Sequence, residues 1–171
     1  DGVDKRIDVI ATALRAGMRA SELAALELAY APPYSSAKDP VNMAGFIIEN
    51  VINQKVRHFF YDDIPSLQKK DAAFLLDTRT MREYSAGHAP GFINIPVDEL
   101  RERLNEVPCD KTVYVMCQSG LRSYIACRIL SAHGYRCFNF AGGYRLYSSI
   151  AGEKVINSSS YDCGMDKKAL Q

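Results

Sequence analysis

One cysteine lies where a thiol could become a nucleophile. Cys117 follows the apolar run Val113-Tyr114-Val115-Met116 and precedes a helical pattern, so its side chain lies where a buried strand turns into a helix. The start of a helix offers unpaired N–H groups and the positive end of the helix dipole, and both favour a thiolate over a thiol. Arg122, five residues later, adds a permanent positive charge. The pattern predicts that Cys117 and Arg122 carry catalysis.

The residues after the cysteine predict what the site holds. Backbone N–H groups from Gln118 to Arg122 can curl around the sulfur as an anion-binding nest, because Gly120 permits the unusual dihedral angles. Cysteine-dependent phosphatases place five residues between the cysteine and the arginine, whereas four intervene here. The smaller loop favours one extra sulfur atom, a persulfide, over a tetrahedral oxyanion. The predicted substrate-binding residues are Gln118, Ser119, Gly120, Leu121 and Ser123.

Strand and helix patterns alternate from residue 56 onward, and they predict how the cysteine is positioned. The expected strands are His58–Tyr61, Phe74–Leu76, Thr112–Met116 and Cys137–Phe140, and the expected helices are Met81–Ser85, Val97–Leu104 and Arg122–His133. This alternation is typical of an α/β fold with an open, largely parallel sheet and helices on both faces. Ligands bind beyond the carboxyl ends of such strands, where Cys117 would lie.

The first 55 residues show a different pattern, three amphipathic helices. One is expected over residues 4–16, a second is capped by Ser21, and a third begins at Asp39-Pro40 and ends near Lys55. Each helix has an apolar face, and the segment has no strand pattern that could cover it. We therefore expect this segment to be incomplete by itself, whereas residues 153–171 lack periodicity and are predicted to be a tail.

Composition and cysteine spacing exclude several classes of function. The formal net charge of +1 and the scattered basic residues argue against a nucleic-acid partner. Cysteines at positions 109, 117, 127, 137 and 163 form no CxxC and no paired Cys/His ligand set, so neither a metal site nor a disulfide framework is predicted. A functional thiol needs a reducing compartment, and no secretory or membrane-spanning segment is recognisable, so we expect no membrane partner and a cytoplasmic location.

Three ordered motifs over residues 56–150 resemble the rhodanese family. They are Cys117 to Ser123, Asp77-Thr78-Arg79 with Glu83-Tyr84, and Gly87-His88-Ala89-Pro90-Gly91-Phe92-Ile93-Asn94-Ile95-Pro96. The resemblance implies a mostly parallel five-stranded sheet and a sulfurtransferase with a persulfide on Cys117. The donor would be thiosulfate or another sulfane sulfur, and the acceptor a thiol or cyanide. Many active members carry a basic residue where this chain has Gln118, so a low-molecular-weight persulfide such as that of coenzyme A becomes the more plausible donor.

The helical segment resembles the end of the dimerisation domain of coenzyme A-disulfide reductases. Lys5 to Ala13 and Leu28 to Asn42 carry this resemblance. It implies a partial dimerisation domain over 1–55, a rhodanese-like domain over 56–152, and a parent enzyme that uses FAD, NAD(P)H and coenzyme A. The chain itself has no Gly-x-Gly-x-x-Gly fingerprint, so no cofactor is expected here. The implied partners are the missing reductase domains and a second copy of the chain, and Tyr30 would serve the reductase site of the parent.

Several residues have a structural interpretation as well as a functional one. Asp77, Arg79 and His88 are predicted to support the site rather than to react. Arg122 could pair with a carboxylate, Asp77 or Glu83, while it also attracts the thiolate. Cys117 itself could be a buried structural cysteine. The competing functions are a cysteine-dependent phosphatase or arsenate reductase, and a non-catalytic module for docking or dimerisation.

Overall fold

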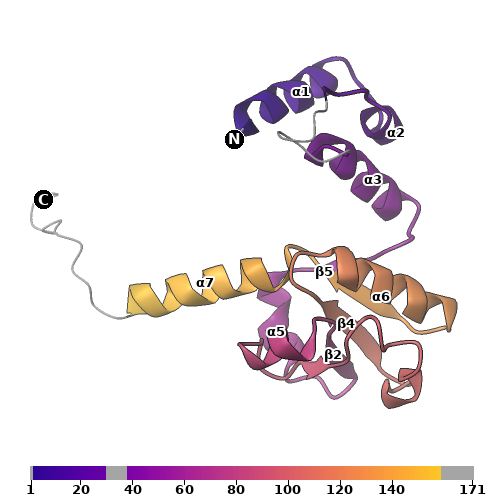
Figure 1. Cartoon of the computed structure of the whole chain (residues 1–171), viewed down its shortest axis with the longest axis vertical. Coiled ribbons are helices and arrows are strands. Elements are labelled where there is room, and N and C mark those ends of the chain that lie inside the picture. Colours follow the sequence, from indigo (N-terminus) through magenta and orange to yellow (C-terminus); the bar gives the residue numbers. More distant parts are fainter. Residues whose placement is uncertain (1, 30–37, 159–171) are drawn as a thin grey trace, which may run out of the picture. The chain divides into compact units, whose positions relative to one another are not determined.

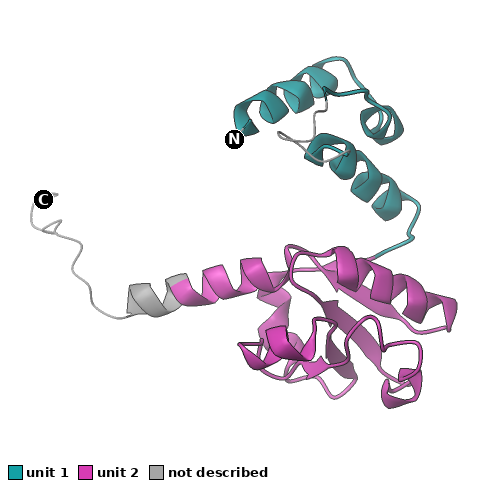
Figure 2. Ribbon diagram, in the orientation of Figure 1, with its two compact units in different colours: residues 1–56 teal, residues 57–171 magenta. Residues whose placement is uncertain are grey.

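The computed structural model describes residues 2–29 and 38–158 of the chain. The chain divides into two compact units, Asp1–Val56 and Arg57–Gln171 (Figure 2). The division falls one residue beyond the boundary that the change of sequence pattern indicates. Each unit is described by itself below.

The described part of unit 1 is helical. Its helices are α1 (Val3–Arg15), α2 (Ala20–Ala24) and α3 (Pro40–Ile52). Asp39 caps α3 by accepting a hydrogen bond from the Val41 N–H, and it pairs with Arg6 at 3.0 Å. The Val41 N–H first, and Arg6 in addition, lower the pKa of Asp39. The expected cap of the second helix was wrong, because Arg19 is at the N-cap position and its N–H donates to the Glu22 carboxylate at 2.6 Å.

Unit 2 contains a parallel sheet. Within the described residues, five strands pair in the order β1-β5-β4-β2-β3, and every pair is parallel. The strands are β1 (His58–Phe59), β2 (Ala73–Asp77), β3 (Ile93–Asn94), β4 (Thr112–Met116) and β5 (Cys137–Phe140). The predicted α/β fold with a parallel sheet is confirmed. The two-residue edge strand β3 was missed because it is too short to show an alternating pattern.

Helices cover both faces of the sheet. The α-helices in the described part of unit 2 are α4 (Ile64–Leu67), α5 (Met81–Ser85), α6 (Leu121–Ala132) and α7 (Gly143–Ser158). Ala126, Ile129 and Leu130 of α6 pack on Val113 and Val115 of β4. Residues of α4 and α7 join Met116 and Phe140 in a second core cluster. Figure 1 shows α6 lying along the sheet. Because helices cover both faces of the central strands, residues of these strands can reach a ligand only at the strand ends.

Two helix predictions in unit 2 differ from the structure. The segment 97–104 forms turns and then a 3-10 helix at Leu104–Glu106. Val97 donates its N–H to Thr78 O at 3.2 Å, and Leu100 is fully buried, so tertiary contacts hold this segment in successive turns. Helix α7 has no counterpart among the predicted helices, and it continues to Ser158 although an aperiodic tail was expected from residue 153. Residues 159–171 lie outside the described residues.

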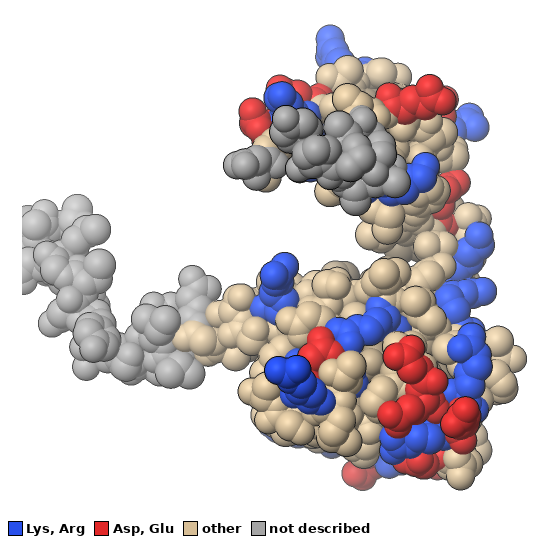
Figure 3. Space-filling view, in the orientation of Figure 1, with Lys and Arg blue, Asp and Glu red and all other residues tan. Residues whose placement is uncertain are grey.

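The surface of unit 2 carries both signs of charge. Figure 3 shows basic and acidic side chains interspersed on the face in view. Arg103, for example, pairs with Glu99 at 2.8 Å and with Glu106 at 2.6 Å. Among the helices in the described ranges, none combines the length and the apolar character needed to cross a membrane.

Candidate active site

Two neighbouring strands of the parallel sheet end at the candidate site. Cys117 directly follows β4, and Asp77 at the end of β2 is in register with Met116 at the end of β4. Thr78 joins the two strand ends, because its N–H and its hydroxyl both donate to Met116 O, at 2.8 and 3.0 Å. The thiol is therefore held at the carboxyl edge of the sheet, where ligands of such folds bind.

The sulfur of Cys117 has two hydrogen-bond donors close to it. The Gly120 N–H lies 3.1 Å from Sγ, and the Ser123 hydroxyl lies 3.2 Å from it. Gly120 has a φ of +116°, which a residue with a Cβ rarely adopts, so glycine is what lets the loop turn its N–H inward. Cys117 is only 1% exposed. A thiolate there would be stabilised by dipoles, which partly offset the cost of burying its charge.

The other predicted loop residues take different places. Gln118 is half-buried, and its Oε1 lies 3.4 Å from Nη1 of Arg79. Ser119 and Leu121 are exposed on the outer side of the loop. Of the five predicted substrate-binding residues, Gly120 and Ser123 are the two whose donors approach the sulfur, whereas the others form the surroundings of the loop.

Arg122 pairs with Glu83, one of the two carboxylates that the sequence offered. The guanidinium donates two hydrogen bonds to the Glu83 carboxylate, at 2.6 and 2.7 Å. The hydrogen bond from Arg122, with smaller contributions from Thr80, lowers the pKa of Glu83 to about 2. Glu83 likewise raises the pKa of Arg122. The ion pair ties α5 to the start of α6, and Glu83 compensates much of the positive charge that Arg122 presents to Cys117.

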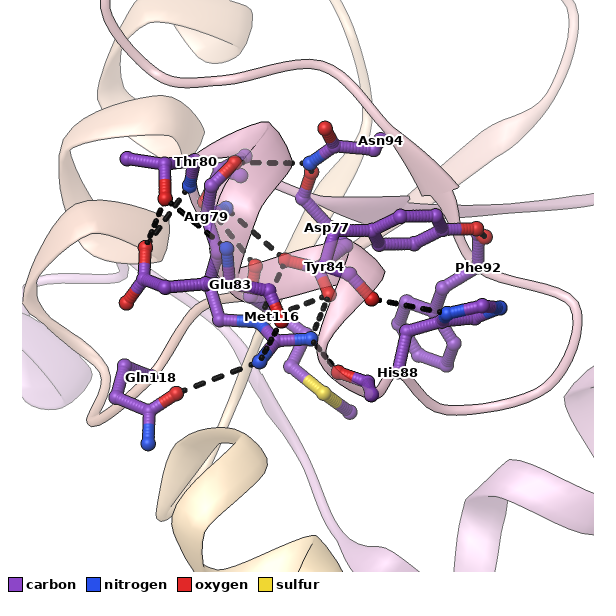
Figure 4. Close-up of polar contacts among 12 residues, drawn as sticks. Asp77, Arg79, Thr80, Glu83, Tyr84, His88, Phe92, Asn94, Met116 and Gln118 are labelled. Carbon is purple, nitrogen blue, oxygen red and sulfur yellow. Dashed lines mark hydrogen bonds and ion pairs between the residues drawn. The ribbon is translucent and has the colours of Figure 1, made fainter.

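A buried ion pair supports the loop from the side of β2. Arg79 and Asp77 are almost fully buried, and Arg79 Nη2 lies 2.7 Å from Asp77 Oδ2. The guanidinium also donates to Gly87 O at 2.8 Å and stacks on the Tyr144 ring, with 3.9 Å to the centroid. Figure 4 shows the Arg79 side chain between Asp77 and Gln118. Arg79 thus connects the end of β2, the turn at Gly87 and the loop from Cys117 to Ser123, called the cysteine loop below. These contacts are consistent with a supporting role.

The start of α7 also supports the loop, and the sequence reasoning missed it. Tyr144 N–H donates to Cys117 O at 2.7 Å, and Arg145 N–H donates to Gln118 O at 3.1 Å. A Cβ on Gly143 would lie 2.6 Å from backbone atoms of Gln118 and Ser119. The available signal was Gly142-Gly143 directly after a strand, since paired glycines there indicate a close backbone approach.

His88 has structural contacts. Its Nδ1 lies 3.1 Å from Tyr84 O, and its ring stacks on the Tyr84 ring at 3.9 Å between centroids. Tyr84 in turn donates its hydroxyl to Phe92 O at 2.6 Å. These contacts fix the turn after α5 (Figure 4). Tyr30, expected to serve the reductase site, lies outside the described residues.

The other cysteines within the described residues do not join the loop. Cys109 is exposed, Cys127 is buried on α6, and Cys137 is buried at the start of β5, while Cys163 lies outside the described ranges. The hydrogen bond from Cys127 lowers the pKa of Cys137 to about 7. Cys137 also contacts Ser131 Oγ at 3.3 Å. The described residues hold no group of three His, Cys, Asp or Glu side chains that could bind a metal ion.

The part of the chain that contains the cysteine loop and the parallel sheet matches a known protein family. Residues 61–149 match the model of the rhodanese-like domain, and the chain belongs to this family. Among curated proteins, a sulfurtransferase of Allochromatium vinosum is 37% identical over 78 residues, which cover 45% of this chain and 73% of that protein. A coenzyme A disulfide reductase of Staphylococcus haemolyticus is 56% identical over 45 residues, 26% of this chain and 10% of that protein.

Solved structures match both the sheet and the N-terminal helices. Reduced Bacillus anthracis CoADR-RHD is 48% identical with a TM-score of 0.85, and the match covers 90% of this chain and 27% of that one. An NAD-dependent persulfide reductase from A. fulgidus is 40% identical with a TM-score of 0.72, and the match covers 82% of this chain and 25% of that one. The chain therefore spans about a quarter of the length of these two reductases and closely resembles their rhodanese-like part.

Proposed function

We propose that the chain is a sulfurtransferase domain that carries sulfur as a persulfide on Cys117. The Cys117 thiolate attacks a sulfane sulfur, a new S–S bond forms at Sγ, and the bond from that sulfur to the rest of the donor breaks. The remainder leaves with the electron pair, as sulfite from thiosulfate or as a thiolate from a low-molecular-weight persulfide. An acceptor thiolate then attacks the outer sulfur and releases the Cys117 thiolate, so each step conserves charge and electrons.

One observation carries this proposal: two donors, the Gly120 N–H and the Ser123 hydroxyl, converge on the sulfur at 3.1 and 3.2 Å. They stabilise the thiolate before attack and after release, because both hydrogen bonds strengthen when the sulfur is charged. The short loop favours a single additional sulfur over a phosphate. The sulfurtransferase among the relatives supports the same chemistry.

We further propose that this chain forms the C-terminal part of an FAD- and NAD(P)H-dependent coenzyme A-disulfide or persulfide reductase. The similarity to two such structures over both units supports this. The cofactors do not fit this chain's own residues, because the glycine fingerprint is missing and the turn from β4 to α6 is occupied by Cys117. They would bind elsewhere in the parent. The acceptor would then be coenzyme A or the cysteine of the reductase.

Mass spectrometry of the intact protein tests sulfur transfer. Wild-type protein and Cys117→Ser are incubated separately with thiosulfate and with coenzyme A persulfide, without reductant, and then weighed. We expect the wild type to gain one sulfur atom and to lose it on addition of a thiol, whereas Cys117→Ser gains none. No gain in the wild type, or an equal gain in the variant, contradicts the proposal. Turnover of an aryl phosphate would favour the phosphatase alternative instead.

A further inference from the structure

The Ser123 hydroxyl has one proton and two acceptors within reach. Its Oγ lies 3.2 Å from Cys117 Sγ and 3.1 Å from Gly120 O. Ser123 is fully buried, so the protein decides which acceptor receives the proton. A hydroxyl can donate to one partner at a time. The stability of the Cys117 thiolate therefore depends on how strongly Gly120 O competes for the Ser123 proton.

The Gly120 carbonyl has more donors than it can accept. Tyr124 N–H lies 3.0 Å from this oxygen, Ser123 Oγ lies 3.1 Å from it, and Asn139 Nδ2 lies 3.4 Å from it. A carbonyl oxygen has two lone pairs. The Tyr124 N–H makes the first hydrogen bond of α6 and is fixed by the helix. Ser123 and Asn139 therefore compete for the second lone pair.

Asn139 is held in position for this competition. It lies on β5, in register with Val115 of β4, and it is 5% exposed. Its backbone N–H donates to Arg57 O at 2.8 Å, which fixes the strand at this residue. Within the described residues its Oδ1 has no hydrogen-bond partner. A buried amide with an unsatisfied oxygen destabilises a core, so the place of Asn139 between apolar neighbours calls for a role.

We propose that Asn139 is a positioning residue for the reacting sulfur. Its amide occupies the second lone pair of Gly120 O, and the Ser123 hydroxyl therefore turns its proton to Cys117 Sγ. Ser123 touches the reacting atom, whereas Asn139 acts through it from another strand. The inference rests on the proposed function in that Cys117 is the reacting thiol.

Alkylation of Cys117 by iodoacetamide tests the inference without any sulfur donor. The test uses the full chain and follows the mass of the Cys117 peptide, so that the other cysteines do not interfere. We expect Asn139→Leu, which has a similar size and no donor, to slow alkylation at pH 7 by about threefold to tenfold, the effect of one ordinary hydrogen bond. The pH midpoint of the alkylation rate should move upward by about half a unit to one unit.

A second background separates this role from a structural one. Ser123→Ala should slow alkylation by a similar factor, and Asn139→Leu should add no further change in that background. The inference is overturned if Asn139→Leu leaves the rate and the pH midpoint unchanged, or if it slows alkylation equally with and without the Ser123 hydroxyl. Asn139→Val, which suits a strand, replaces the leucine variant if that one does not fold. A wild type that alkylates as expected and yet gains no sulfur contradicts the proposed function alone.

Discussion

At the scale of single residues, the charge around Cys117 is nearly balanced. Glu83 pairs with Arg122 and Asp77 pairs with Arg79, so the positive charge of each guanidinium is largely compensated within the protein. The groups that the structure does direct at the sulfur are two hydrogen-bond donors, the Gly120 N–H at 3.1 Å and the Ser123 hydroxyl at 3.2 Å. A sulfur donor that carries two negative charges, such as thiosulfate, gains little electrostatic attraction from such a site. Gln118 directly follows the cysteine. A change of charge at this position should therefore alter which sulfur donor the site prefers.

Gln118→Lys should raise the rate of sulfur transfer from thiosulfate by about fivefold, the effect of one partly exposed charge pair worth about 1 kcal/mol. Transfer from a persulfide with a smaller charge should change less. Gln118→Met is the matched control, because it is similar in length and neutral, and we expect it to stay within about twofold of the wild type. The measurement is the initial rate of persulfide formation with each donor. Equal gains with lysine and methionine would disprove an electrostatic cause.

The Glu83–Arg122 pair makes stability depend on pH. The pKa of Glu83 is about 2 in the folded protein, below its ordinary value of 4.5. A lowered folded pKa stabilises the protein above pH 4.5, and this stabilisation is lost as the pH falls towards 2. The whole shift would correspond to about 3 kcal/mol, but each side chain is about a third exposed, so screening leaves about 1 kcal/mol.

Glu83→Gln should therefore lower the free energy of unfolding by about 1 kcal/mol at pH 7, and the difference from wild type should shrink as the pH falls from 4.5 to 2. Urea unfolding at several pH values measures it. Glu102→Gln serves as a control, since Glu102 is an exposed carboxylate on the same unit. A difference between wild type and Glu83→Gln that stays constant over this range would show that the effect does not come from ionisation.

At the scale of elements, α7 holds the cysteine loop by its first turn. Two of its N–H groups donate to Cys117 O and Gln118 O, and this fixes the direction of these two loop carbonyls. Because the C=O and N–H of a trans peptide point in opposite directions, the N–H groups of Gln118 and Ser119 then point away from α7. The contact requires Gly143, which has a φ of +65° and lies against the loop backbone.

Gly143→Ala should destabilise the protein by about 1 to 3 kcal/mol and slow persulfide formation, because the new Cβ would have to move the loop backbone. Gly152→Ala lies in the same helix, where an added Cβ meets nothing within 4 Å. We expect it to be neutral or to stabilise by up to about 1 kcal/mol. Thermal unfolding measures the stability of each variant, and the gain in mass on incubation with a sulfur donor measures its persulfide formation. If both variants behave alike, the close approach of α7 to the loop has no effect.

At the scale of the whole molecule, the two units differ in how much apolar surface they cover. Unit 2 buries two core clusters, one on each face of its sheet. Unit 1 has a core of Ala13, Leu23 and Val41, and it exposes large apolar side chains along α1 and α3. These exposed side chains are Val3, Ile7, Ile10, Leu14, Met43, Ile47, Ile48, Val51 and Ile52. Unit 2 should therefore fold without unit 1, and the reverse should not hold.

The segment 57–171, produced by itself, should form the Cys117 persulfide within about twofold of the rate of the full chain, because all the described contacts of the cysteine loop lie inside unit 2. Circular dichroism and the gain of one sulfur atom measure this. Segment 1–56 should show less helix by itself than the structure describes. A folded 57–171 segment that cannot gain sulfur would mean that unit 1 contributes to the site.

The sequence by itself determined the features that depend on neighbouring residues. The strand Thr112–Met116, the cysteine that follows it, the glycine of the loop and the four-residue spacing to Arg122 follow from local patterns of burial and backbone freedom. Only the tertiary structure decided which groups meet across long separations. Glu83 rather than Asp77 pairs with Arg122, α7 holds the loop, and Asn139 reaches Gly120 O. These contacts join residues that are brought together by the order of the parallel strands, and a local pattern carries no information about that order.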